Sequence, residues 1–243
     1  MDIKKFLKKH NLEPKSKYDQ YFLKNEEILN LEIDLADLKK DDIVLEIGAG
    51  FGNLTEKIAK KAKVIAVEKD PRFIKFLEKI KNVKVKYGDA LNILDKKKLN
   101  FNKIISNIPY YLSQKLLIKF MKRKWEKAMI IVQKEFEEKM RKDTKLSLLI
   151  DDCCEMKIEG TVPDQAFYPK AITSALVVLK QKKEMDIGFW KFLKQMFRYN
   201  NKNVKNALDY LNIDYTPQKS IQQKKVQKLS KKEIKKIYKN LKK

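Results

Sequence analysis

Four consecutive residues, Asn107 to Tyr110, carry the most specific chemistry in the sequence. They follow a short apolar run at 104–105 that predicts a strand, and ligands of parallel sheets bind outside the carboxyl ends of strands. Pro109 stiffens the turn and biases Ile108 away from helical geometry. The side-chain carbonyl of Asn107 and the backbone carbonyl of Ile108 can then accept hydrogen bonds from one amino group.

Two acceptors of this kind suit an exocyclic amine such as N6 of adenine. The lone pair of that nitrogen is conjugated with the ring, so the amine becomes a nucleophile only when both N–H bonds are held in a tetrahedral arrangement. The ring of Tyr110 offers a face for stacking the base and stabilises positive charge that develops on nitrogen. Neither a carboxylate base nor a metal is needed. A structural Asn-Pro turn with a packed tyrosine is the alternative interpretation of these four residues alone.

A second stretch, residues 43–53 (IVLEIGAGFGN), joins a predicted buried strand to a predicted helix through three alternate glycines. Gly48 permits a tight turn, Gly50 lets a ligand approach the backbone, and Gly52 lets the helix sit close to the strand. Strand, glycine turn and helix in this order are typical of a cofactor-binding loop, although a glycine-rich loop alone is a weak signal.

Nearby acids indicate which cofactor the loop binds. Asn53 stands where a dinucleotide-binding G-x-G-x-x-G pattern would have its third glycine, which disfavours a pyrophosphate. Glu46, beside the loop, suits a ligand with positive charge, such as the sulfonium and ammonium of S-adenosylmethionine. Glu68 ends the second predicted strand, where an acid can bond both ribose hydroxyls. We therefore expect S-adenosylmethionine as the cofactor.

The 243-residue chain has a formal net charge of +24 at pH 7, mostly from lysine. This surplus predicts attraction to a polyanion, with affinity that falls as salt rises. No apolar run approaches the ~18 residues of a membrane span, and the N-terminus lacks a signal-peptide pattern. We expect a cytoplasmic protein that binds nucleic acid and no membrane. Cys153 and Cys154, adjacent in a predicted strand, predict neither a disulfide nor a zinc site.

Apolar strand and helix patterns alternate along most of the chain. Strands are predicted at 43–47, 63–68, 83–87, 104–105, 128–132, 152–159 and 174–180, with helices between most of them. This alternation predicts an α/β fold with a mostly parallel, doubly wound sheet.

The composition changes near residue 182. The following residues have helical patterns and many lysines, and Ser230 to Glu233 forms a capping box before the last helix. We expect three parts: a basic, loosely ordered N-terminal arm over 1–17, a catalytic α/β domain over 18–182 and a small basic helical domain, which binds RNA, over 183–243.

Taken together, these motifs resemble one known family. Over residues 17–212 the chain is similar to the ribosomal RNA adenine N6-dimethyltransferases, which modify two adjacent adenosines near the 3′ end of small-subunit RNA. The matching segments are residues 20–23 (QYFL), EIGAGFGNLT, AVEKD, GDAL, SNIPYYLS, VPDQAFYP, SALVVL and residues 201–208. The resemblance implies a Rossmann-like methyltransferase sheet with a C-terminal helical domain, S-adenosylmethionine as cofactor, and small-subunit rRNA or an immature small subunit as partner. It also implies a monomer without metal.

The resemblance further implies roles for individual residues. The expected cofactor-binding residues are Tyr21, Leu23, Gly48, Gly50, Glu68, Asp89 and Asn107, and the expected catalytic residues are Asn107, Ile108, Pro109, Tyr110 and Phe167. Asp89 would accept a hydrogen bond from the adenine amino group of the cofactor. Phe167 would pack against the target adenine.

Three departures from the family pattern fall on the side that receives the RNA. Asp19 stands where the family usually has glycine, and Thr144-Lys145 stands where it often has Gly-Arg. Residues 170–172 shorten a run that is proline-rich in the family. The target is therefore less firmly predicted than the cofactor.

Three other functions remain compatible with the sequence. A non-catalytic RNA- or DNA-binding factor in ribosome assembly or transcription could share the fold, although a pure binder has no need of Asn107, Pro109 or Glu68. DNA adenine methylation uses the same kind of four-residue turn. Large-subunit RNA is an alternative target of the same reaction.

Overall fold

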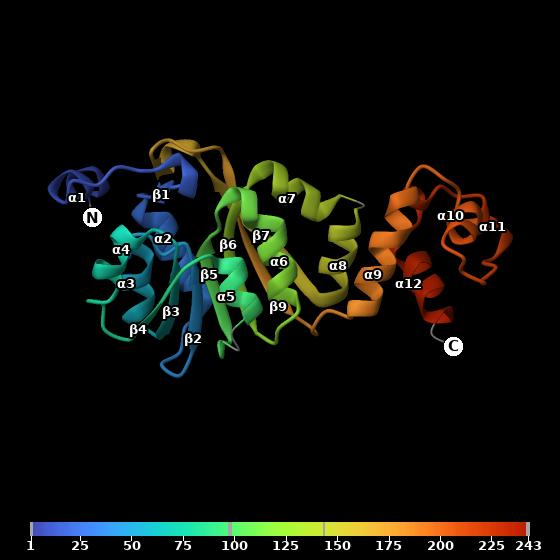
Figure 1. Ribbon diagram of the computed structural model, residues 1–243, viewed down its shortest axis with the longest axis horizontal. Helices are drawn as coiled ribbons and strands as arrows, with labels where there is room; N and C mark the ends of the chain where they lie inside the picture. Colours follow the sequence, from blue (N-terminus) through green and yellow to red (C-terminus); the bar gives the residue numbers. More distant parts are fainter. Residues whose placement is uncertain (1, 97–98, 143, 242–243) are drawn as a thin grey trace. The chain divides into compact units, whose positions relative to one another are not determined.

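The computed structural model describes residues 2–96, 99–142 and 144–241 and divides the chain into two compact units (Figure 1). Unit 1 comprises Met1–Glu137 and Cys154–Lys182, and unit 2 comprises Glu138–Cys153 and Lys183–Lys243. The expected division at residue 182 differs from this one, because residues 138–153 group with the C-terminal residues. Met1 and residues 242–243, which end two of the expected parts, lie outside the described residues.

A seven-stranded sheet forms the centre of unit 1. Its strands are β2 (Ile43–Ile47), β3 (Lys63–Glu68), β4 (Val83–Tyr87), β5 (Lys103–Asn107), β6 (Lys127–Gln133), β7 (Cys154–Val162) and β9 (Ser174–Gln181), in the order β4-β3-β2-β5-β6-β9-β7. The first five strands in that order are parallel, whereas β9 and β7 are antiparallel additions. Chain order reverses between β2 and β5. The α/β doubly wound fold predicted from the alternation is confirmed.

A second, two-stranded sheet joins distant parts of the chain. β1 (Phe22–Leu23) pairs antiparallel with β8 (Phe167–Tyr168), so that Leu23 lies opposite Phe167. The pairing brings residues 20–23, the first segment that matches the family, next to Phe167, which the resemblance places against the target adenine.

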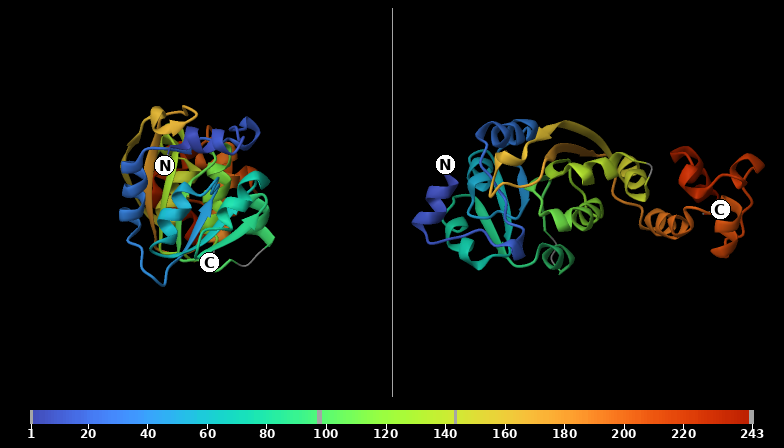
Figure 2. Two further views of the ribbon diagram at one scale, coloured as in Figure 1. Left: turned by 90° about the vertical axis from the view of Figure 1, so that its left-hand side faces the viewer. Right: turned by 90° about the horizontal axis from the view of Figure 1, so that it is seen from above.

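Unit 1 contains the helices α1 (Ile3–Lys9), α2 (Glu26–Ala36), α3 (Asn53–Ala59), α4 (Pro71–Leu77), α5 (Ala90–Lys96) and α6 (Ser113–Met121), the first residues of α7 (Lys134–Arg141), and the short 3-10 helices η1 (Ser16–Tyr18), η2 (Tyr110–Leu112) and η3 (Asp164–Ala166). α2 lies on one face of the sheet and α6 on the other (Figures 1 and 2). Asn25 and Asp70 begin α2 and α4 by accepting backbone N–H groups, as good N-caps do.

The N-terminal arm is more ordered than its charge suggested. Residues 3–9 form α1, in which Ile3 and Leu7 are buried. Phe6 stacks on Phe51 of the glycine loop, with 4.6 Å between ring centroids, and His10 packs against Phe6 and Phe76. The sequence did not predict this helix because lysines stand between its apolar residues.

Unit 2 is helical apart from its loops. Its elements are α8 (Lys145–Cys153), α9 (Ile187–Met196), η4 (Phe197–Tyr199), α10 (Val204–Tyr210), α11 (Lys219–Gln222), η5 (Val226–Lys228) and α12 (Lys231–Asn240). The predicted capping box of Ser230 and Glu233 is confirmed. Asp152 of α8 pairs with Lys183 and Lys235 at 2.9 and 2.8 Å, which ties α8 to the segment before α9 and to α12.

Two smaller observations complete the fold. Cys153 ends α8 and Cys154 begins β7, so the prediction that both belong to one strand was wrong; both side chains are buried. The helix extends to Cys153 because Leu146, Leu149 and Cys153 are buried at the spacing of one helix face. In the described part of the chain, no helix has the length and apolar character needed to cross a membrane.

The buried ammonium group of Lys103 joins the C-terminal end of α2 to the sheet. Lys103 of β5 is 4% exposed, and its Nζ lies 3.0 Å from Oδ2 of Asp42. The same Nζ donates to the backbone carbonyls of Ala36 and Asp37 at 2.9 and 2.6 Å. These carbonyls end α2, where cations are favoured by the helix dipole. Removal of the ammonium would leave the Asp42 carboxylate buried beside unpaired carbonyls.

We therefore predict that Lys103→Met lowers the free energy of unfolding by about 3 kcal/mol, because breaking a buried ion pair leaves an uncompensated charge. Urea denaturation monitored by circular dichroism measures the change. Lys61→Met is the matched control, since Lys61 pairs with Asp34 at the surface and should change stability by less than ~1 kcal/mol. Equal effects of the two substitutions would refute the structural role of Lys103.

Candidate active site

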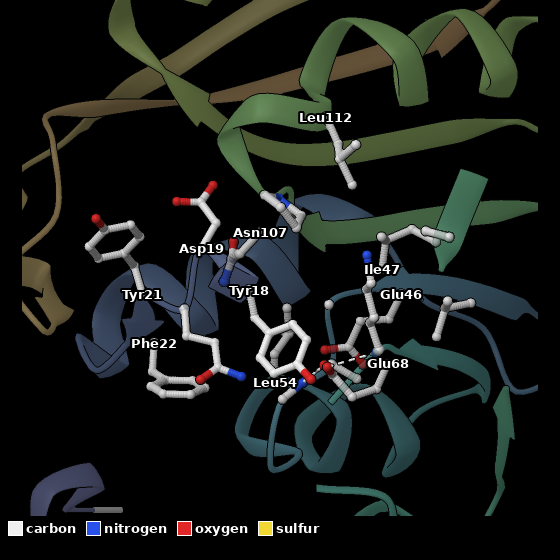
Figure 3. A pocket seen from close by; sticks show the side chains of 18 of the residues that line it. Tyr18, Asp19, Tyr21, Phe22, Glu46, Ile47, Leu54, Glu68, Asn107 and Leu112 are labelled. Atoms are coloured by element: carbon white, nitrogen blue, oxygen red, sulfur yellow. Dashed lines mark hydrogen bonds between the residues drawn. The ribbon is translucent and has the colours of Figure 1, made fainter. Parts of the chain in front are cut away.

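Two adjoining pockets lie at the carboxyl ends of β2 and β5, where the strand order reverses and ligands of such sheets bind. The larger, which we call the glycine-loop pocket, has an empty volume of about 840 Å³, part of it open to solvent (Figure 3). It is lined by all the residues expected to bind the cofactor, which are Tyr21, Leu23, Gly48, Gly50, Glu68, Asp89 and Asn107. Motifs spread over nearly 90 residues therefore meet in one cavity.

The smaller cavity, which we call the turn pocket, has an empty volume of about 250 Å³. It is lined by all the expected catalytic residues, Asn107, Ile108, Pro109, Tyr110 and Phe167, together with Asp19, Tyr21 and Ile131. Asn107 lines both pockets. Its Oδ1 is buried and has no hydrogen-bond partner among the described residues. A free acceptor thus lies where the two cavities adjoin.

Glu68 organises the glycine loop from the end of β3. Its Oε2 accepts the backbone N–H of Gly50 at 2.7 Å, and its Oε1 accepts those of Lys69 and Asp70 at 2.8 and 2.7 Å. Burial raises the pKa of Glu68, and these backbone N–H groups offset the shift only in part. A carboxylate accepts about four hydrogen bonds, so roughly one site remains for a hydroxyl of a ligand.

The glycines of the loop permit close packing that a side chain would prevent. Gly50 has a φ of +57°, and a Cβ there would lie 3.0 Å from the ring of Phe22. Gly52 has a φ of +101°, and its Cβ would lie 2.7 Å from Cδ1 of Ile80 and 3.3 Å from Leu77. The close neighbours of Gly52 are therefore residues of and just beyond α4, not the strand that the sequence analysis expected.

Two carboxyl groups are buried near the pockets. Glu46 of β2 is 2% exposed, and its Oε2 has no hydrogen-bond partner in the described ranges. Burial raises the pKa of Glu46 to about 8; the nearby Thr55 hydroxyl opposes this rise and the charge of Glu68 adds to it. An unpartnered buried oxygen of this kind favours a ligand that brings a proton donor or a positive charge.

Sequence reasoning missed the second buried acid, Glu32 of α2. The side chain is fully buried, and neither carboxyl oxygen has a hydrogen-bond partner within the described residues. Burial, followed by the charge of Glu46, raises the pKa of Glu32 well above its usual value; the Asn107 amide opposes the shift without completing a hydrogen bond of standard geometry. A signal was present, because Glu32 occupies a core position of α2 between Leu29 and Ala36.

Asp89 follows β4 and lines the glycine-loop pocket. Its Oδ1 accepts the backbone N–H of Leu91 at 2.9 Å, and its Oδ2 pairs with Lys69 Nζ at 3.1 Å. Burial alone would raise the pKa of Asp89, but the ion pair with Lys69 and the backbone N–H bonds lower it, so this carboxylate is ionised at neutral pH. Lys69 was not among the predicted site residues.

Hydrogen bonds hold the turn of residues 107–110 from several sides. The Ser106 hydroxyl donates to the carbonyl of Ile47 at 2.8 Å, which joins the ends of β5 and β2. The Tyr110 hydroxyl lies 3.0 Å from that of Ser174, and the ring of Tyr110 stacks on Tyr21 with 5.7 Å between centroids. The turn is thus fixed at its strand and at its aromatic end.

Residues flanking the motifs complete the pockets. Tyr18 and Asp19, just before residues 20–23, line the same pocket as Asn107 and Glu68; the ring of Tyr18 points toward Glu68, whereas the carboxylate of Asp19 points away from it (Figure 3). Tyr111 and Leu112, after the turn, line the same pocket. Sequence reasoning did not select these four as site residues, although each lies within three positions of a residue that it selected.

The three departures from the family pattern occupy different places. Asp19 lines both pockets. Thr144 and Lys145 lie at the start of α8 in unit 2, and residues 170–172 lie between β8 and β9; none of these lines either pocket. Only Asp19 alters the site itself.

Comparisons with known proteins agree with this architecture. The family model described as ribosomal RNA adenine dimethylase matches residues 11–243. A protein of Pyrococcus furiosus named probable ribosomal RNA small subunit methyltransferase A is 37% identical over 216 residues, which cover 84% of this chain and 78% of that protein.

Solved structures show the same fold. A dimethyladenosine transferase from Plasmodium falciparum has a TM-score of 0.76 and 25% identity, with 89% of this chain and 95% of that chain covered. The 23S rRNA methyltransferase ErmE has a TM-score of 0.66 and 20% identity, with 91% and 100% covered, which is a likeness of fold. The family model and the Pyrococcus relative confirm the resemblance predicted from the motifs, and this chain belongs to the ribosomal RNA adenine dimethylase family.

Proposed function

We propose that this enzyme transfers two methyl groups from S-adenosylmethionine to N6 of adjacent adenosines near the 3′ end of small-subunit rRNA, during ribosome biogenesis. One observation carries the proposal: Asn107 lines both pockets, and its Oδ1 has no hydrogen-bond partner among the residues that the structure describes. An acceptor shared by two cavities suits a reaction in which an amine in one pocket meets a methyl donor in the other.

The glycine-loop pocket suits S-adenosylmethionine in its charges and shape. The Oε2 of Glu46, which has no partner within the described residues, would face the positive end of the cofactor, and Glu68 would hold a ribose hydroxyl with its remaining acceptor site. Asp89 would accept a hydrogen bond from the adenine amino group of the cofactor. When bound, S-adenosylmethionine supplies an electrophilic methyl group on a positively charged sulfur.

The turn pocket would hold the target base. Asn107 Oδ1 and the backbone carbonyl of Ile108 would accept the two N–H bonds of the adenine amine and so direct its lone pair out of the ring plane. Tyr110 and Phe167 contribute aromatic faces that line the pocket. In the second transfer one N–H remains, so one acceptor still orients the nitrogen. The adenine must leave its stack to enter, which costs least in a loop.

The basic surface would hold the RNA. The chain carries 56 lysines and arginines against 32 acids, and unit 2 is rich in exposed lysines. We infer that residues 183–243 bind phosphates while unit 1 performs the reaction. Contacts of this kind add affinity without reading sequence, and they weaken as salt rises.

We predict that Asn107→Ala lowers methyl transfer by at least ~100-fold, because it removes an acceptor that aligns the amine. The measurement is transfer from labelled S-adenosylmethionine to immature small ribosomal subunits, with mass spectrometry of the digested nucleosides. Asn92→Ala, an exposed change on α5, is the control and should retain full activity.

Different results identify different functions. Dimethyladenosine made by the wild type and lost in Asn107→Ala supports the proposal. Transfer to large-subunit RNA or DNA in place of small subunits would reassign the substrate. Cofactor binding without transfer to any of these would point to another RNA target, and the absence of both transfer and cofactor binding would favour the non-catalytic factor.

The pKa of about 8 for Glu46 yields a second prediction. Glu46 is mostly protonated at pH 7, and a cation bound beside it lowers its pKa, so S-adenosylmethionine binding should release a proton. Calorimetric titrations at pH 7 in buffers of different ionisation enthalpy measure the release. Glu46→Gln should abolish it. If the wild-type binding enthalpy is the same in all buffers, no proton is released, and the positive charge of S-adenosylmethionine does not bind beside Glu46.

A further inference from the structure

Asp19 has a backbone conformation that few side chains adopt. It follows η1 with φ 55° and ψ 45°, in the left-handed region that favours glycine. Asp19 lines both pockets. Strained positions of this kind at a site persist when the side chain makes a contact that the structure needs.

That contact is with the turn of residues 107–110. Asp19 Oδ2 accepts the backbone N–H of Tyr110 at 2.6 Å, across 91 positions of sequence. Tyr110 begins η2, whose preceding residue, Pro109, makes no side-chain cap hydrogen bond. Burial raises the pKa of Asp19, and the N–H groups of Tyr110 and Tyr111 oppose the rise. Asp19 therefore caps η2 from a distant segment.

The segment that carries Asp19 is itself anchored. Gln20 Nε2 donates to Oδ2 of Asp70 at 2.8 Å, and Gln20 Oε1 accepts the backbone N–H of Lys15 at 2.8 Å. Arg72 in turn pairs with Asp70, with Nη2 2.6 Å from Oδ2. The carboxylate of Asp19 thus connects a fixed point beside α4 to the turn that bears Asn107.

We propose that Asp19 is a positioning residue for methyl transfer, acting through the Tyr110 N–H to hold the 107–110 turn in the orientation that presents the acceptors of Asn107 and Ile108 to the target amine. The inference rests on the proposed function. It concerns geometry, so the acceptor atom on residue 19 matters and its negative charge is secondary. Glycine would suit the backbone of residue 19 but would release the turn.

Three variants separate these contributions. Asp19→Gly removes the strain and the acceptor. Asp19→Asn keeps an oxygen acceptor and tolerates the left-handed conformation. Asp37→Gly is the matched control, because Asp37 ends α2 with φ 48° and lines neither pocket. The measurements are kcat and KM for methyl transfer to small subunits, the melting temperature, and hydrogen exchange of the Tyr110 amide by NMR.

For Asp19→Gly we expect kcat to fall at least ~10-fold and the Tyr110 amide to exchange at least ~10-fold faster, while the melting temperature stays within about 4 °C of wild type. Asp19→Asn should restore most of kcat, and Asp37→Gly should change neither kcat nor Tyr110 exchange. The positioning role of Asp19 is refuted if Asp19→Gly lowers kcat by less than ~10-fold or leaves the exchange of the Tyr110 amide unchanged. It is also refuted if the melting temperature falls far enough for unfolding to explain the lost activity. An inactive wild type would refute the proposed function alone, since Tyr110 exchange would still decide whether Asp19 holds the turn.

Discussion

The site depends on the parallel pairing of β2 with both β3 and β5. Backbone hydrogen bonds set this register, with Leu45 opposite both Ile65 and Ile104. Because the three strands point the same way, their carboxyl ends deliver the glycine loop, Glu68 and Asn107 to one edge of the sheet. Helix packing, loop closure and the second small sheet refine the pockets, but each acts on an edge that the strand pairing has already assembled.

A concentration of buried acid sits at this edge. Glu32, Glu46 and Glu68 are nearly inaccessible to solvent, and each has a raised pKa because burial disfavours the charged form. A protein of net charge +24 therefore has, at this edge of the sheet, a group of buried acids that ionise more readily when a cation binds beside them. The contrast suits an enzyme that handles a cationic donor inside and a polyanion outside, since each ligand is drawn to a different part of the same molecule.

Much of the fold and most of the pocket lining could be predicted from the sequence, because strand, turn and helix signals are local. Ile43–Ile47 and the helix over 134–141 need no distant partner to be recognised. The features that escaped prediction depend on tertiary contacts. α1 is ordered by aromatic packing on Phe51, α8 extends to Cys153 because that side chain is buried in the fold, and Glu32 meets Asn107 only after α2 folds onto the sheet.

The pairing of β1 with β8 has a consequence for synthesis on the ribosome. Leu23 emerges early but finds Phe167 only after 144 further residues have been made, which takes on the order of ten seconds at typical elongation rates. Until then β1 lacks its strand partner, and the turn pocket lacks Phe167, which lines it. The nascent chain consequently completes its active site late, shortly before the C-terminal helices leave the exit tunnel.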